Sequence, residues 1–207
     1  MMVSCRVNAG NEIHTKEIKH MNTTAALYKD LTKVLVSREE IAKAVREMGQ
    51  RITQDYAGKE PVMICILKGA SVFFTDLIRE VDLPITTEFM AISSYGGGTK
   101  STGIVKIIKD LDRDISGRDV LIVEDIVDSG RTLAHLSEVL KTRKANSINI
   151  VTLLDKPARR VVPLQVKYSC FDIPDAFVVG YGLDYDEKYR NLPDIGILAP
   201  KIYGGEG

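Results

Sequence analysis

Cysteine, an excess of charge of either sign, and long apolar runs are all scarce in this sequence. Its three cysteines, Cys5, Cys65 and Cys170, are odd in number and lack the spacing of a disulfide framework or a metal site. Cys65 lies in the apolar run PVMICIL, where we expect it to fill space in the core. Because this usage favours a reducing compartment, we expect a cytoplasmic protein.

Charge and hydropathy exclude further classes. The chain carries 28 basic and 28 acidic residues, so its overall field does not favour a nucleic-acid partner, and we expect none. No apolar stretch approaches the length needed to span a bilayer, so we expect no membrane partner. The three histidines show no metal-ligand spacing.

The chain of 207 residues, 44% of them apolar, suits one domain with a sizeable core. The first twenty residues lack the apolar segment of a signal peptide. We expect residues 1–22 to form a flexible tail, with Met21 a candidate for the natural start, and residues 23–207 to form a single domain.

Three familiar phosphate motifs are also missing. The Walker pattern does not occur, because GGGTKST has the wrong order, and no GxGxxG is present, which argues against a dinucleotide fold. A phosphoaspartate DxDx[TV] signature fails because Asp125 and Asp128 are three residues apart. Any phosphate site must therefore be built differently.

What the sequence does contain is an alternation of apolar strands and helices. Ser37 and Glu40 form a capping box that opens a helix with apolar residues at helical spacing. Strands are predicted at 61–67, 85–92, 104–109, 119–125 and 148–154, with helices at 70–80 and over LAHLSEVLK. Shorter strands follow near 166–170 and 176–181, before a loop-rich end. Three of these strands are apolar on both faces, which is typical of an α/β fold with a mostly parallel central sheet flanked by helices.

Three unusual segments begin where buried strands stop: LKGA, EDIVDSGRT and DKPARR. In open parallel sheets, ligands bind outside the carboxyl ends of the strands. We therefore expect these segments to meet at one rim and to form the site there. We expect the charges of Arg159 and Arg160, within DKPARR, only to be solvated.

The second of these segments predicts a phosphate loop. Asp128, Ser129, Gly130, Arg131 and Thr132 join a strand to a helix, whose N-terminus offers free N–H groups and a positive dipole end. Gly130 allows close approach of the backbone, and the two hydroxyls add donors. In isolation, Asp128 is equally typical of a helix N-cap.

Glu124 and Asp125 precede this loop directly. Two carboxylates would repel a phosphate unless they face sugar hydroxyls or a metal ion, and Mg²⁺ takes oxygen ligands together with substrate phosphates. The segment therefore predicts a ribose-phosphate cradle. The alternative is a strand that ends in solvated acids and a helix cap.

The strip VLIVEDIVDSGRTL resembles the phosphoribosyl-pyrophosphate motif of the type I phosphoribosyltransferases. From about residue 30 to about 200, the chain resembles the hypoxanthine-guanine branch of that family through ILKGA, SSYG, VKIIKDLD, LLDKP, IPDAFVVGYGLDY and YRNLPDIG, in this order. The resemblance implies a small hood built from the N-terminal segment and about residues 165–207. It also implies a purine-salvage activity that joins phosphoribosyl pyrophosphate to hypoxanthine or guanine, releasing pyrophosphate.

By the same resemblance, Asp128 corresponds to the catalytic acid beside purine N7. Lys68 and Gly69 correspond to a pyrophosphate loop with a cis peptide between Leu67 and Lys68, and Arg190 to a further pyrophosphate contact. Glu124, Asp125 and the loop correspond to the binding site for the ribose and its 5′-phosphate.

The resemblance also implies a purine site. Lys156 would donate to purine O6, and because an ammonium group only donates, this favours 6-oxo bases. Phe177 would stack on the purine and the backbone of Val178 would contact its edge. Asp184 belongs to this group and is also a ligand of Mg²⁺, together with Glu124 and Asp125. Without the resemblance, Lys156 is an ordinary loop lysine and Phe177 an ordinary core residue.

The glycine-rich segment 93–103 is too long for a tight turn and has the composition of a lid. The resemblance places Ser94 and Tyr95 in this lid and implies a homodimer or homotetramer. Three alternatives stay open: a phosphoribosyltransferase for another base such as xanthine or adenine, an RNA-binding regulator on the same fold, and a plain ribose-phosphate binding module.

Overall fold

A six-stranded sheet forms the centre of the structure, a computed structural model that describes residues 23–94 and 105–204. Across the sheet, the order is β4 (Val105–Lys109), β3 (Thr86–Ser94), β2 (Val62–Leu67), β5 (Asp119–Val127), β6 (Ser147–Asp155) and β7 (Tyr168–Asp172). All neighbouring strands are parallel except β3 and β4. The predicted mostly parallel sheet is confirmed.

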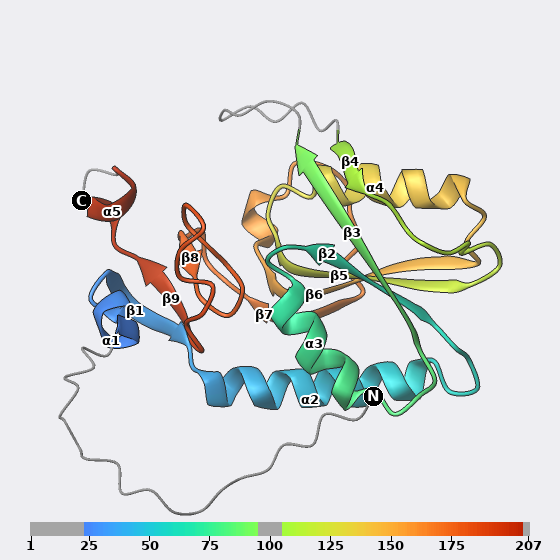
Figure 1. The fold of residues 1–207 in the computed structure, drawn as a ribbon, viewed down its shortest axis with the longest axis horizontal. Coiled ribbons are helices and arrows are strands. Elements are labelled where there is room, and N and C mark those ends of the chain that lie inside the picture. Colours follow the sequence, from blue (N-terminus) through green and yellow to red (C-terminus); the bar gives the residue numbers. More distant parts are fainter. Residues whose placement is uncertain (1–22, 95–104, 205–207) are drawn as a thin grey trace, which may run out of the picture.

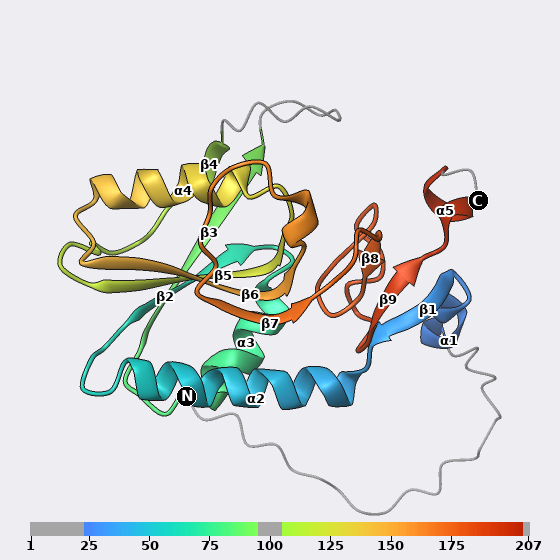
Figure 2. The same cartoon turned by 180° about the vertical axis from the view of Figure 1, so that it is seen from behind.

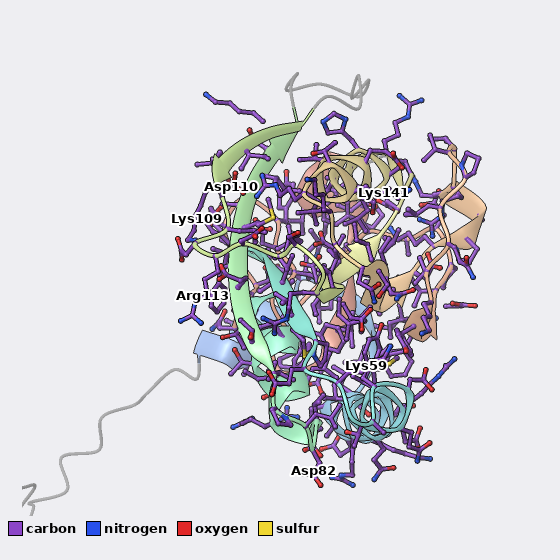
Figure 3. The ribbon with its side chains drawn as sticks, turned by 90° about the vertical axis from the view of Figure 1, so that its right-hand side faces the viewer. Lys59, Asp82, Lys109, Asp110, Arg113 and Lys141 are labelled. Atoms are coloured by element: carbon purple, nitrogen blue, oxygen red, sulfur yellow. The ribbon has the colours of Figure 1, made fainter. Side chains whose placement is uncertain are left out.

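Helices cover both faces of this sheet (Figure 1). Helices α2 (Arg38–Asp55) and α3 (Ser71–Glu80) pack on one face, and α4 (Arg131–Thr142) packs on the other. Figure 3 shows the sheet between its two helix layers. Lys141 of α4 lies on one side of the strands, and Lys59, which follows α2, lies on the other. Side chains of β2 alternate between the two cores, with Cys65 in the core under α2 and α3 and Ile64 in the core under α4.

The predicted start of α2 is confirmed in detail. The Ser37 hydroxyl accepts a hydrogen bond from the backbone N–H of Glu40, and the Glu40 carboxylate accepts one from the backbone N–H of Ser37 at 2.8 Å. The apolar residues at helical spacing all face the core: Ile41, Val45, Met48 and Ile52. Within the described ranges, no helix has the length and apolar character needed to cross a bilayer.

A second, smaller sheet joins the two ends of the chain (Figures 1 and 2). It consists of β1 (Leu31–Val36), β9 (Ile195–Leu198) and β8 (Val178–Val179), all antiparallel. Helices α1 (Thr23–Tyr28) and α5 (Pro200–Tyr203) pack with it through a small apolar cluster. These five elements, called the hood below, bring the two terminal regions together.

Several boundaries differ from those expected. Strand β7 lies within the range assigned to the hood, yet it pairs with β6, because Tyr168 at its start is buried in the core of the main sheet. Strand β5 does not stop at Asp125 but continues to Val127, which lies opposite Asp155 of β6. The strand expected at 176–181 is only two residues long, and β1, β9 and α5 were not foreseen. Of the predicted lid, Ser94 ends β3, whereas Tyr95 lies outside the described residues.

Candidate active site

A pocket of about 260 Å³ opens at the carboxyl ends of the parallel strands. It is lined by Asp125, Ile126, Asp128, Lys156, Phe177, Val178, Leu183 and Asp184. Six of these eight residues were predicted as site residues, and they come from the end of β5, the segment after β6, and the hood region. The parallel pairing of β5 with β6 explains this, since it brings the ends of both strands to one edge.

Asp128 lies between two cations in this pocket. Its Oδ1 atom is 3.5 Å from Nζ of Lys156 and 3.7 Å from Nε of Arg159. The N-cap of α4 is Gly130, with a left-handed φ of 79°, so Asp128 is not the cap of this helix. The Oδ1 atom is buried and has no hydrogen-bond partner among the described residues, whereas the Asp128 side chain as a whole is 48% exposed and lines the pocket.

Lys156 is buried, with 6% of its surface exposed, so it is not a solvated loop lysine. Its Nζ atom donates to the backbone carbonyl of Ala176 at 2.8 Å, and its backbone N–H donates to the carbonyl of Val127. A buried ammonium group needs such acceptors and a nearby counter-charge, which Asp128 supplies. The carbonyl and Asp128 thus hold the Lys156 head group at the pocket.

The paired acids Glu124 and Asp125 lie near the end of β5. Burial, aided by the charge of Asp125, raises the pKa of Glu124 well above its usual value, and one of its buried oxygens has no hydrogen-bond partner in the described part of the chain. Burial also raises the pKa of Asp125 to about 6, although the backbone N–H of Ile126 and the charge of Arg190 oppose this. Asp125 lines the pocket and Glu124 does not, as alternating directions along a strand require.

The segment after β2 packs directly against Asp125. A Cβ atom on Gly69 would lie 1.8 Å from Oδ2 of Asp125 and 3.5 Å from the carbonyl oxygen of Gly182, so only glycine fits there. The peptide bond between Leu67 and Lys68 is cis, as predicted. The exposed side chain of Lys68 forms an ion pair with Glu187.

Arg190 contacts the segment that contains Gly182 and the pocket residue Asp184. Its guanidinium pairs with Asp184 at 2.9 Å and donates to the carbonyl of Gly182 at 2.8 Å. Asp184 also accepts a hydrogen bond from the backbone N–H of Glu187. The predicted pyrophosphate residues Gly69 and Arg190 therefore both meet Gly182, beside Asp125 and Asp184.

An aromatic group forms the hood side of the pocket. Phe177 is 40% exposed, and its ring stacks on Tyr203 with centroids 5.0 Å apart and contacts Tyr185 edge-on. It is therefore not a core residue. Val178 next to it is buried in β8. Since Phe177 lines the pocket while Tyr203 does not, Tyr203 supports the ring from outside the pocket.

Most of the chain matches known proteins. The phosphoribosyl transferase domain family matches residues 32–186. The hypoxanthine-guanine phosphoribosyltransferase of Streptococcus thermophilus (strain CNRZ 1066) is 54% identical over 177 residues, covering 86% of this chain and 98% of the relative. That of Bacillus subtilis (strain 168) is 55% identical over 174 residues, covering 84% and 97%. The chain belongs to the hypoxanthine-guanine phosphoribosyltransferase family.

Solved structures of phosphoribosyltransferases have the same fold. A crystal structure of a hypoxanthine phosphoribosyltransferase from Staphylococcus aureus superposes with a TM-score of 0.84 at 52% identity, covering 86% of this chain and 97% of that one. A hypoxanthine-guanine phosphoribosyltransferase from Bacillus anthracis gives a TM-score of 0.79 at 46% identity, covering 82% and 99%.

The donor set of the pocket fits the magnesium ion that this phosphoribosyltransferase family implies. Asp125 and Asp184 line one pocket, and Glu124 has an unpaired buried oxygen. Among the residues described, no group of three or more His, Cys, Asp or Glu side chains is close enough to hold an ion alone. Protein sites commonly hold Mg²⁺ through one or two carboxylates, water and substrate phosphates, and Asp125 and Asp184 are carboxylates of this kind.

The site of this phosphoribosyltransferase also contains residues that the sequence reasoning missed. The expectation that Arg159 and Arg160 are only solvated is wrong: Arg159 pairs with Asp175 at 3.0 Å and approaches Asp128, and Arg160 forms a partly buried ion pair with Asp155. Both arginines follow a strand end at the predicted rim, and that position was the available signal. Their charge favoured the wrong environment, because two successive arginines in a loop are most often solvated.

Proposed function

We propose that this chain transfers the 5-phosphoribosyl group from phosphoribosyl pyrophosphate to N9 of hypoxanthine or guanine. The products are the purine nucleotide and pyrophosphate, and the pathway is purine salvage. The observation that carries the proposal is the placement of Asp128 beside Lys156 in one pocket with Asp125 and Asp184. Relatives more than 50% identical over almost their whole length carry the name of this activity.

On the purine side, Lys156 donates a hydrogen bond to O6 of the base. Its ammonium group can only donate hydrogen bonds, and a 6-amino group on the purine is also a donor, so these two groups would not form a hydrogen bond. Asp128 accepts or holds the proton at N7 as the new bond to N9 forms. Phe177 stacks on the ring from the hood, and the backbone of Val178 contacts the edge of the base.

On the sugar side, Glu124 and Asp125 bind the ribose hydroxyls, and the backbone and hydroxyls of residues 129–132 bind the 5′-phosphate at the start of α4. Lys68, Gly69 and Arg190 bind the pyrophosphate. Asp125 and Asp184, which line the pocket, would hold Mg²⁺, with Glu124 of the same strand end as the third predicted ligand, and the ion would supply positive charge to the leaving pyrophosphate.

The chemistry asks mainly for positioning and for charge around an oxocarbenium-like transition state. The carboxylates of Asp125 and Asp128 would face the positive charge that develops on the ribose and the purine.

One assay tests the proposal. Purified protein with Mg²⁺ and phosphoribosyl pyrophosphate is incubated separately with hypoxanthine, guanine, xanthine, adenine and uracil, and nucleotide formation is followed by chromatography. We expect turnover with hypoxanthine or guanine and little with adenine or uracil. Turnover with xanthine alone, or binding of phosphoribosyl pyrophosphate without turnover of any base, would overturn it.

We also propose that the chain acts in the cytoplasm and assembles as a homodimer or homotetramer. Cys65 and Cys170 are free thiols, which suits a reducing compartment. Sedimentation equilibrium of the purified protein measures the assembly state, and a monomer at micromolar concentration would contradict this part of the proposal.

A further inference from the structure

An ion pair outside the pocket lies directly behind the phosphate loop. Asp155, the last residue of β6, pairs with Arg160, and the two side chains are only 12% and 16% exposed. Asp155 faces Val127 across the β5–β6 ladder, one residue before Asp128. The pair is therefore anchored to the strand that leads into the loop.

Arg160 fills the space behind Gly130. A Cβ atom on Gly130 would lie 2.9 Å from Cδ and 3.0 Å from Nη1 of Arg160, so the guanidinium arm packs against the glycine backbone. The backbone N–H of the next residue, Val161, donates to the carbonyl of Ser129 at 3.1 Å. The segment that carries Arg160 thus contacts the loop at two successive residues.

The phosphate loop has a backbone conformation that needs support. Gly130, the N-cap of α4, has a left-handed φ and, as a glycine, has no side chain that could cap the helix. Glycine is flexible in the unfolded chain, so contacts with other residues must fix this conformation. The Ser129 hydroxyl accepts only a long 3.4 Å bond from the backbone N–H of Arg131. A loop that presents N–H groups to a phosphate must keep them aligned before the ligand arrives.

We propose that Asp155 and Arg160 are positioning residues for the 5′-phosphate loop. Asp155 fixes the guanidinium of Arg160 against Gly130, and this contact keeps the amide groups of residues 129–132 pointed at the phosphate. Neither side chain lines the pocket, so they act through the loop. The inference rests on the proposed function, in which this loop binds the 5′-phosphate of phosphoribosyl pyrophosphate.

The test uses ribose 5-phosphate and pyrophosphate as separate probes, with dissociation constants measured by calorimetry. Arg160→Ala and the milder Asp155→Asn should each weaken ribose 5-phosphate binding about tenfold, since a small misplacement of binding groups costs that much or more. Both variants should bind pyrophosphate as the parent protein does. In turnover, the KM for phosphoribosyl pyrophosphate should rise while the KM for the purine stays unchanged, and Arg160→Lys should recover part of the loss.

Arg143→Ala is a matched control. Arg143 follows the other end of α4 and forms a bidentate, partly exposed ion pair with Asp110, far from the loop. It should lower stability without changing either dissociation constant.

Parent-like ribose 5-phosphate binding in both variants would overturn the inference while leaving the proposed function intact. Equal weakening of pyrophosphate binding, or the same loss in Arg143→Ala, would also overturn it, because the effect would then be a general loss of structure. If the parent protein turns over purines but does not bind ribose 5-phosphate, the assignment of the loop fails and the inference with it.

Discussion

At the scale of single residues, the end of β5 and the loop after it place three carboxylates in three different surroundings. Asp128 lies between the cations of Lys156 and Arg159, Asp125 lies in a buried strand end, and Glu124 keeps one unpaired buried oxygen. The neighbours of a carboxylate determine its role, because they set its charge and the directions from which it can accept hydrogen bonds. The three acids of one short motif therefore have separable roles, and substitutions should separate them.

Replacing Asp128 by asparagine should affect the chemical step. The amide side chain would keep the shape but lose the charge and the ability to take a proton, so we expect the turnover number to fall by about a hundredfold or more. The KM for phosphoribosyl pyrophosphate should change little, since the loop after residue 128 is retained. Steady-state kinetics with both substrates measures this. Asp175→Asn, which removes a partner of Arg159 outside the pocket, is the control, and equal losses in turnover number and in substrate affinity would contradict a catalytic role.

Asp125 should show a pH signature in stability. Burial raises its pKa from an ordinary value near 4 to about 6, so the folded protein binds this proton more tightly than the unfolded chain does. Stability should therefore fall as pH rises from about 4 to about 6, and the ionised carboxylate costs about 3 kcal/mol above that range. Asp125→Asn should be more stable than the parent at pH 7.5, with no difference near pH 4.

Urea unfolding at pH 4, 5, 6 and 7.5 measures this difference. Asp186→Asn is the control, because that side chain is 76% exposed. The gain in stability should come with a loss of affinity for phosphoribosyl pyrophosphate, since a charge kept at a cost is typical of a binding site. A difference between Asp125→Asn and the parent that stays constant over this pH range would refute the argument.

At the scale of elements, strand ends and the segments that follow them build the site. Gly69, after β2, is held against Asp125 of β5, and the ladder between β2 and β5 sets the spacing. Gly69 does not have a left-handed backbone, so an alanine there would be opposed only by the contact with the Asp125 carboxylate. Gly58 is the opposite case, with a φ of 76° and open space around it.

Gly69→Ala should therefore displace Asp125 or its own loop and raise the KM for phosphoribosyl pyrophosphate about tenfold or more. Gly58→Ala should instead lower stability by about 1 kcal/mol through backbone strain and leave the kinetics unchanged. Kinetics and thermal unfolding of the two variants distinguish the effects. If both lose stability and neither changes KM, the close packing of Gly69 against Asp125 has no part in binding.

Elements also show what could be predicted from the sequence. The buried strands β2, β5 and β6 and the capped helix α2 were predicted because apolar runs and capping residues are local signals. Strand β1 was missed because only its last residue is buried, and β8 because two residues carry no periodicity. Both are stabilised by pairing with β9, which lies near the opposite end of the chain from β1, so the contact is long-range.

The site residues also divide into those that local sequence signals predict and those that they do not. Asp125 lies near the end of β5, and Asp128 and Lys156 directly follow strand ends, so the parallel sheet alone predicts that they meet. Phe177, Val178 and Asp184 were predicted only through a family resemblance, since their segment has no strong local signal. The ion pair of Asp155 with Arg160 was missed because its burial depends on how the segment after β6 folds back on the loop.

At the scale of the whole molecule, the hood and the main sheet hold opposite sides of one pocket. The sheet carries Asp125 and Asp128, and the hood carries Phe177 and Val178. Asp194, which precedes β9, joins the two parts: it accepts hydrogen bonds from the backbone N–H of Arg38 at 2.7 Å, from the Arg38 guanidinium and from the Tyr28 hydroxyl. Arg38 begins α2 on the main sheet and Tyr28 ends α1 of the hood.

Asp194→Asn should loosen this junction. Burial acts to raise the pKa of Asp194, but hydrogen bonds from Tyr28 and Arg38 outweigh it and hold the pKa below its usual value. The interaction therefore stabilises the fold above about pH 4 and is lost as pH falls through the lowered pKa. We expect a loss of about 2 kcal/mol at pH 7, shrinking below pH 4, measured by urea unfolding against Asp186→Asn.

The same variant should also separate the two substrates. Because the hood carries the aromatic side of the pocket and the sheet carries the ribose-phosphate loop, a loosened junction should raise the KM for the purine more than the KM for phosphoribosyl pyrophosphate. Tyr28→Phe, which removes one hydrogen bond and keeps the ring, should give a smaller change in the same direction. An equal rise in both KM values would mean that the two parts move as one body, and that Asp194 stabilises the fold without setting the position of the hood over the purine.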